Sequence, residues 1–186
     1  MSISHKYQLI GIAGTLASGK DTVAGVLERD FGYTHASLGD IIREVAMKER
    51  GSVERPVLFD VADQHRKADG AGAFVKVALE KQRPLVITGV RTLGEAKAIK
   101  GGGGVLLFID APLEVRYERM KSRQRDSESQ LDVAGFKHHE DKEWFAGPSD
   151  AEFNLRDVKA MSDIVIDNAL ELEPFLELVI KKLELR

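Results

Sequence analysis

Short apolar runs predict five β-strands in this chain. Runs of only a few residues, without polar interruptions, are typical of strands that are buried on both faces of a parallel sheet. The runs at 84–90 and 105–109 fit this description best, because Thr88 is the one polar residue that they contain. The predicted strands cover residues 7–13, 33–37, 84–90, 105–109 and 164–166.

Between these runs, apolar residues recur at the three- and four-residue spacing of amphipathic helices. Ile41 and Val45 share one face of such a helix, Asp40 is placed to cap its start, and Gly51 is placed to end it. The predicted helices cover residues 21–29, 40–49, 56–67, 73–81, 93–100, a basic segment after Pro112, and 172–185. Strands that alternate with helices throughout predict a single α/β domain, residues 1–186, with a parallel sheet between two helical layers.

Residues 126–150 are polar and show no clear periodicity. Irregular segments of this length in a compact domain are usually functional or mobile. We therefore expect a lid of about residues 116–157 on a core formed by residues 7–115 and 158–186.

Composition narrows the class of protein. The chain has 186 residues, a net charge of −3 and no cysteine, which excludes disulfides and thiolate-ligated metals and fits a reducing cytoplasm. No apolar run approaches the roughly 20 residues that cross a bilayer.

The mild acidity also argues against general nucleic-acid binding. We expect a cytoplasmic protein, a monomer or homodimer, that binds a small molecule; an anionic ligand would need positive charges gathered locally.

The most specific motif lies between the first predicted strand and the first predicted helix. It consists of Gly14, Thr15, Leu16, Ala17, Ser18, Gly19 and Lys20. This spacing is that of a phosphate-binding loop, in which the glycines let backbone N–H groups turn inward and the following helix N-terminus favours an anion. Lys20 is expected to neutralise the β- and γ-phosphates of ATP, and Thr22 to lie near the α-phosphate. Asp21 stands where serine or threonine usually binds Mg²⁺, so a carboxylate would meet the metal directly or through water.

The chain resembles P-loop kinases of the nucleoside monophosphate kinase group, especially those related to adenylate kinase and dephospho-coenzyme A kinase. Four further segments occur in the family's order: residues 37–43 (SLGDIIR), 88–93 (TGVRTL), 116–125 (RYERMKSRQR), which resembles the stretch leading into the lid, and 161–168 (MSDIVIDN). The resemblance implies a three-layer α-β-α P-loop kinase fold with a five-stranded parallel sheet and a mobile lid. It also implies ATP and Mg²⁺ as cofactors.

Two arginines form the acceptor site that this resemblance implies. Arg43 lies in the Gly-Asp-x-x-Arg segment, and Arg91 directly follows a buried strand, where ligands of parallel sheets bind. A planar guanidinium grips phosphate at two points. Asp40 is expected to contact the substrate and magnesium-bound water, besides capping its helix. The alternative for either arginine is that it forms a surface ion pair and binds no ligand.

The donor and lid residues come from later segments. Arg116, Arg119 and Arg123 fall at i, i+3 and i+7, so they share one helix face. A solvated basic face is the common explanation for such a run. Beside a lid, we expect Arg119 and Arg123 to neutralise the moving phosphoryl group. Asn168 is expected to contact adenine, on the resemblance alone.

One departure concerns the metal. Where the family usually carries an acidic residue at the end of the third strand, this chain has Thr88. Mg²⁺ would therefore depend on Asp21 and Asp40 for its carboxylate ligands.

Phosphoryl transfer between two polyanions is mostly positioning and charge neutralisation. The sequence thus predicts an ATP- and Mg²⁺-dependent kinase, with a nucleoside monophosphate as the first choice of acceptor (NMP + ATP to NDP + ADP) and dephospho-coenzyme A as the second. Two other classes stay open: a regulatory ATPase that works as a switch, and a binding module without turnover. The pair Arg43 and Arg91, with no evident water-positioning switch motif, argues against the switch.

Overall fold

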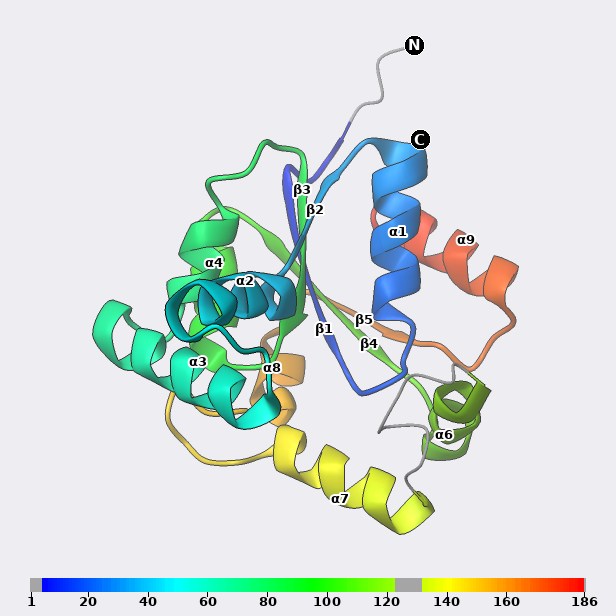
Figure 1. Ribbon diagram of the computed structural model, residues 1–186. Helices are drawn as coiled ribbons and strands as arrows, with labels where there is room; N and C mark the ends of the chain where they lie inside the picture. Colours follow the sequence, from blue (N-terminus) through cyan, green and yellow to red (C-terminus); the bar gives the residue numbers. More distant parts are fainter. Residues whose placement is uncertain (1–4, 123–131, 186) are drawn as a thin grey trace.

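The computed structural model describes residues 5–122 and 132–185. In this part of the chain, a five-stranded sheet lies between helices (Figure 1). Its strands are β1 (Leu9–Gly14), β2 (Thr34–Ser37), β3 (Leu85–Val90), β4 (Val105–Asp110) and β5 (Ile164–Asp167), in the spatial order β2-β3-β1-β4-β5. All four pairings are parallel, so the predicted three-layer arrangement is confirmed. None of the helices described is long and apolar enough to span a membrane.

Alternate residues of the central strand face opposite helical layers. Ile10 and Ile12 of β1 join an apolar cluster with α1 (Lys20–Phe31) and α9 (Leu172–Lys182). Leu9 and Ala13 join a second cluster on the other face. The helices of this second layer are α2 (Leu38–Arg50), α3 (Arg55–Asp69), α4 (Ala73–Ala78), α5 (Leu93–Gly101) and α8 (Leu155–Met161). Burial on both faces explains why the strands read as continuous apolar runs.

The start of α2 differs from the prediction. Ser37 is the N-cap, and its Oγ accepts a hydrogen bond from the backbone N–H of Asp40. The prediction that Asp40 caps this helix is therefore wrong; Asp40 lies in the first turn, where its charge still suits the helix dipole. Gly51 ends the helix in the left-handed conformation, as predicted.

The polar stretch after α6 (Leu113–Ser122) contains a helix that periodicity did not predict, α7 (Val133–Trp144). Its two buried residues are Phe136 and a carboxylate, Glu143, so the inward face carries almost no apolar signal. Phe136 packs with Met120 of α6 and Ala17 of the loop after β1. Both α6 and α7 lie beyond the carboxyl end of β1 (Figure 1), the edge at which ligands of parallel sheets bind.

Phe108 of β4 is fully buried in the cluster against α8. We expect Phe108→Ala to lower the free energy of unfolding by about 3–5 kcal/mol, because it removes the ring's contacts and leaves a cavity. Urea denaturation followed by circular dichroism measures this. Val165 on the edge strand β5 is 48% exposed, and Val165→Ala serves as the control with a change of about 0.5 kcal/mol or less. Equal losses in the two variants would contradict this placement of the core.

Candidate active site

The loop between β1 and α1 is the centre of the candidate site, and its path requires glycine at two positions. Gly14 has φ +148°, and a Cβ there would lie 2.0 Å from the carbonyl oxygen of Ile109. Gly19 has φ +103°, and a Cβ there would lie 2.6 Å from Nδ2 of Asn168. Because α1 begins at Lys20, the positive end of the helix dipole adjoins the loop. This is the geometry of an anion site.

Two strands on one side of β1 hold the loop in place. At the end of β4, Oδ1 of Asp110 accepts a hydrogen bond from Oγ1 of Thr15 at 2.8 Å. After β5, Nδ2 of Asn168 donates to the carbonyl oxygen of Ser18 at 2.8 Å. Burial alone would raise the pKa of Asp110, but hydrogen bonds from Lys159 and Thr15 outweigh it and hold that pKa below its usual value. A charged Asp110 thus anchors the first half of the loop and Asn168 the second.

Lys20 folds back over the loop, where its Nζ donates to the carbonyl oxygen of Thr15. Burial, with the nearby positive charge of Arg91, lowers the pKa of Lys20 to about 8. The carboxylates of Glu143 and Asp21 act in the opposite direction but do not compensate. The ammonium group therefore lies in a site that is short of negative charge, which the phosphates of a bound nucleotide would supply.

The two predicted acceptor arginines each face a carboxylate. Arg43 NH1 lies 2.6 Å from Oδ1 of Asp40, and both side chains are exposed. Arg91 NH1 lies 3.1 Å from Oε1 of Glu143 on α7. Ala13 of β1 pairs with Val90 of β3, so Arg91 leaves its strand beside the start of the loop, and its charge also acts on Lys20. Among the residues that the structure describes, the hydrogen bond and ion pair of Arg43 are with Asp40.

Buried Glu95 fixes the backbone at Arg91. Its Oε2 accepts hydrogen bonds from the N–H groups of Arg91 at 2.9 Å and Thr92 at 3.2 Å, and its Oε1 pairs with NH2 of Arg66 at 2.8 Å. Thr92 and Glu95 form a capping box at the start of α5. Sequence reasoning missed Glu95, although the Thr-x-x-Glu spacing was a signal that could have found it.

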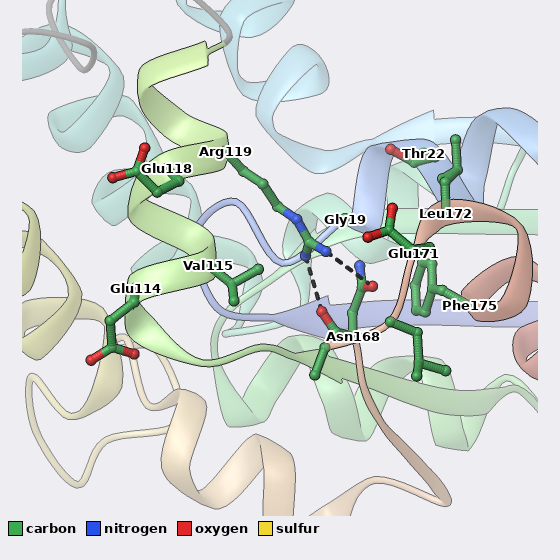
Figure 2. A pocket seen from close by; sticks show the side chains of 12 residues that line it. Gly19, Thr22, Glu114, Val115, Glu118, Arg119, Asn168, Glu171, Leu172 and Phe175 are labelled. Carbon is green, nitrogen blue, oxygen red and sulfur yellow. Dashed lines mark hydrogen bonds between the residues drawn. The ribbon is translucent and has the colours of Figure 1, made fainter.

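The arginines of α6 have different surroundings, so α6 does not present one uniform basic face. Figure 2 shows Arg119 reaching Asn168, with NH1 3.1 Å from its backbone oxygen and NH2 3.4 Å from its Oδ1. Arg116 is buried, donates to the carbonyl oxygen of Ala111 at 2.6 Å, and pairs with Glu140 of α7. Arg116 thus joins α6 to α7 and also donates from NH1 to the loop carbonyl oxygen of Leu16 at 3.4 Å, whereas Arg119 contacts Asn168. Arg123 lies outside the described residues.

A pocket of about 680 Å³ adjoins the loop between α6 and the connection from β5 to α9 (Figure 2). Gly19 and Thr22 line it on the loop side, Arg119 on the α6 side, and Asn168 and Phe175 on the third side. The volume and the mixture of apolar and polar walls suit a small organic ligand. Asn168 contacts both the loop and Arg119, so it connects the pocket to the anion site.

The end of β3 carries no carboxylate. Thr88 is buried, and its Oγ1 lies 2.9 Å from Nε2 of His35 on β2. Asp21 is exposed in the first turn of α1, and Asp40 pairs with Arg43. Among residues 5–122 and 132–185, no three His, Asp or Glu side chains are grouped to hold a metal ion. Mg²⁺ commonly needs only one or two carboxylates when substrate phosphates and water complete its shell, a role that Asp21 fits by its place after Lys20.

A glycine-rich loop that follows the central strand of a parallel sheet, in the order β2-β3-β1-β4-β5, defines a P-loop α/β domain. The chain belongs to the AAA domain family, whose model matches residues 10–143, and to the UPF0200 proteins. The UPF0200 protein of Pyrobaculum aerophilum is 30% identical over 185 residues, covering 96% of this chain and 98% of that protein. A UPF0200/UPF0201 protein of Archaeoglobus fulgidus is 30% identical over 181 residues, which are 91% of this chain and 53% of that protein.

Solved structures share the fold. TT1252 from Thermus thermophilus has a TM-score of 0.62 at 24% identity, covering 97% of both chains. Shikimate kinase from Bacteroides thetaiotaomicron has a TM-score of 0.62 at 14% identity, covering 95% of this chain and 96% of that chain. Deoxyadenosine kinase from M. mycoides, with bound dATP, has a TM-score of 0.56 at 14% identity, covering 96% and 100%. The fold is therefore that of P-loop kinases.

The lowered pKa of Lys20 predicts that nucleotide binding takes up protons. Without ligand, Lys20 is half protonated near pH 8, and polyphosphate raises its pKa, so binding of ATP at pH 8 takes up about half a proton per site. As pH rises above about 8, the affinity falls until the pKa of the complex is reached. Isothermal titration calorimetry in buffers of different ionisation enthalpy measures the uptake.

The matched control is Lys20→Arg, whose guanidinium stays charged over this pH range. We expect no proton uptake in this variant. Equal uptake in the two proteins would show that another group titrates.

Proposed function

We propose that this protein is an ATP- and Mg²⁺-dependent kinase that transfers a phosphoryl group to a nucleotide-like acceptor. The observation that carries the proposal is the juxtaposition of two cations at the carboxyl edge of the sheet: Lys20 begins the helix after the loop of β1, and Arg91 follows β3, which pairs with β1. Phosphoryl transfer needs such positive charge on both sides of the moving group. The P-loop kinase fold of the solved relatives agrees with this function.

The donor would occupy the loop and the neighbouring pocket. The loop N–H groups and Lys20 would hold the β- and γ-phosphates, and Thr22 would face the α-phosphate. The nucleoside would fill the pocket of about 680 Å³ between Arg119 and Asn168. Mg²⁺ would be held by the phosphates, water and Asp21, with Asp40 as a second candidate; the ion would neutralise charge on the phosphates.

The acceptor would bind opposite, where Arg91 and Arg43 offer guanidinium groups to a phosphate. A nucleoside monophosphate is the simplest acceptor of this kind. Dephospho-coenzyme A is the second candidate, in which a hydroxyl reacts while a phosphate is held by the arginines. The carboxylate of Glu143 beside Arg91 favours this second candidate, because a carboxylate accepts a hydrogen bond from a hydroxyl but repels a phosphate.

Helices α6 and α7 would form the lid, which includes Arg119 and, outside the described residues, Arg123. The buried ion pair between Arg116 and Glu140 and the packing of Phe136 on Met120 make α6 and α7 one unit. Closure of this unit over the loop would exclude water, the condition that separates a kinase from an ATPase.

Two substitutions test the assignment of donor and acceptor sites. We expect Lys20→Ala to lower turnover by about 10²–10³-fold with every acceptor, because one charge contact to the transferring group is lost. Arg91→Ala is expected to lower kcat/KM for the acceptor by a similar factor, while the affinity for ATP stays close to that of the wild type. ADP formation with a panel of nucleoside monophosphates and dephospho-coenzyme A measures both.

Lys48 is exposed in the last turn of α2, and Lys48→Ala is the control for loss of a lysine. Unchanged acceptor kinetics in Arg91→Ala would contradict the acceptor site. A rate of ADP formation that does not depend on any acceptor would support the regulatory ATPase instead, and ATP binding without turnover would support a binding module.

A further inference from the structure

Glu143 is a nearly buried carboxylate at the candidate site that the resemblance does not assign. It lies near the end of α7, and its side chain is 11% exposed. Oε1 lies 3.1 Å from NH1 of Arg91. The charge of Glu143 also acts on Lys20. Glu143 is therefore close both to the expected γ-phosphate ligand and to the expected acceptor ligand.

Other acidic groups near this edge of the sheet are already engaged. Both oxygens of Asp110 and both oxygens of Glu95 accept hydrogen bonds, and Asp40 is exposed and paired with Arg43. β3 (Leu85–Val90) carries Thr88 near its end and contains no acid. Within the described part of the chain, Glu143 pairs with Arg91 through Oε1, which leaves Oε2 to a ligand. Glu143 is thus the buried carboxylate that can receive a ligand group.

The chemistry of that group follows from the charge of Glu143. A phosphate acceptor brings a nucleophilic oxygen that has already lost its proton, and a neighbouring carboxylate repels it. A hydroxyl must lose its proton as it attacks, and a carboxylate within hydrogen-bonding reach is the usual group that takes it. We propose that Glu143 accepts the proton of an acceptor hydroxyl, so that the acceptor is an alcohol bearing an anionic group, not a phosphate nucleophile.

In this step, the hydroxyl oxygen of the acceptor forms a bond to the γ-phosphorus of ATP. The bond from that phosphorus to the β–γ bridging oxygen breaks, and its electron pair leaves with ADP. The hydroxyl proton moves to Oε2 of Glu143 and then to water. Arg91 holds the other oxygen of Glu143 and binds the anionic group of the acceptor. The assignment rests on the proposed kinase function.

The linkage of the product tests the proposal directly. The protein is incubated with Mg²⁺, ATP labelled at the γ-phosphate, and separately AMP, CMP, UMP, dTMP and dephospho-coenzyme A, with deoxyadenosine as the acceptor that lacks an anionic group. The products are then boiled in acid, which cleaves phosphoanhydrides and leaves alkyl phosphate monoesters. We expect an acid-stable labelled product. An acid-labile nucleoside diphosphate as the main product would overturn the role of Glu143 and leave the kinase function standing. Release of phosphate to water with every acceptor would overturn the kinase function itself.

Substitution of Glu143 tests the proton transfer. Glutamine keeps the shape and can still accept a hydrogen bond from Arg91, so we expect Glu143→Gln to retain the fold and ATP affinity but to lose about 10²–10⁴-fold in kcat with the hydroxyl acceptor. Asp141→Asn, an exposed carboxylate on the same helix, is the matched control with unchanged kcat. An unchanged kcat in Glu143→Gln would overturn the proposal.

A double variant separates proton transfer from a merely structural role. If Glu143 acted only by holding Arg91, then adding Glu143→Gln to Arg91→Ala would cause no further loss. As the proton acceptor, Glu143 predicts a further fall in kcat in the double variant, and rescue of part of the activity by Glu143→Asp. Absence of the further fall would overturn the proposal.

Discussion

The candidate site depends on hydrogen bonds that fasten one loop to the ends of two neighbouring strands. Thr15 is held by Asp110 at the end of β4, and the carbonyl oxygen of Ser18 is held by Asn168 after β5. A loop that presents backbone N–H groups to an anion would otherwise lose much conformational entropy on binding. Here the hydrogen bonds to the sheet order the loop before an anion binds. They can form because the carboxyl ends of the parallel strands meet at one edge. The same residue that holds the loop, Asn168, also receives Arg119 from α6.

Pairing of charges is the second constraint on this site. The chain has a net charge of −3, so a site for polyanions must collect its cations locally. The structure brings cations together near the loop, and three of the arginines form ion pairs with carboxylates: Arg43, Arg91 and Arg116. Lys20 instead folds onto a carbonyl oxygen and is left with a lowered pKa. A phosphate therefore gains the most favourable charge interaction at Lys20, whereas at Arg91 it must compete with the carboxylate of Glu143.

The sheet and the loop could be predicted from the sequence because both are local signals: apolar runs mark buried strands, and glycine spacing marks the loop. α7 could not, because its inward positions are Phe136 and Glu143, and a carboxylate that is buried through an ion pair looks like a surface residue in the sequence. The contacts of Arg116 could not be predicted either, because its partner Glu140 lies on a separate helix. Arg91 was found through its place after a strand, but Glu95, which holds its backbone, was not. Charge pairs between distant segments depend on packing that a pattern along the chain does not contain.

The most direct test of the account is a crystal structure of the protein with Mg²⁺ and a non-hydrolysable ATP analogue. We expect the triphosphate to lie within the loop, with Nζ of Lys20 moved from the carbonyl oxygen of Thr15 to the β- and γ-phosphates, and the γ-phosphate facing Arg91. A nucleotide bound elsewhere, with Lys20 still on Thr15 and the loop empty, would contradict the claim that this loop is the donor site.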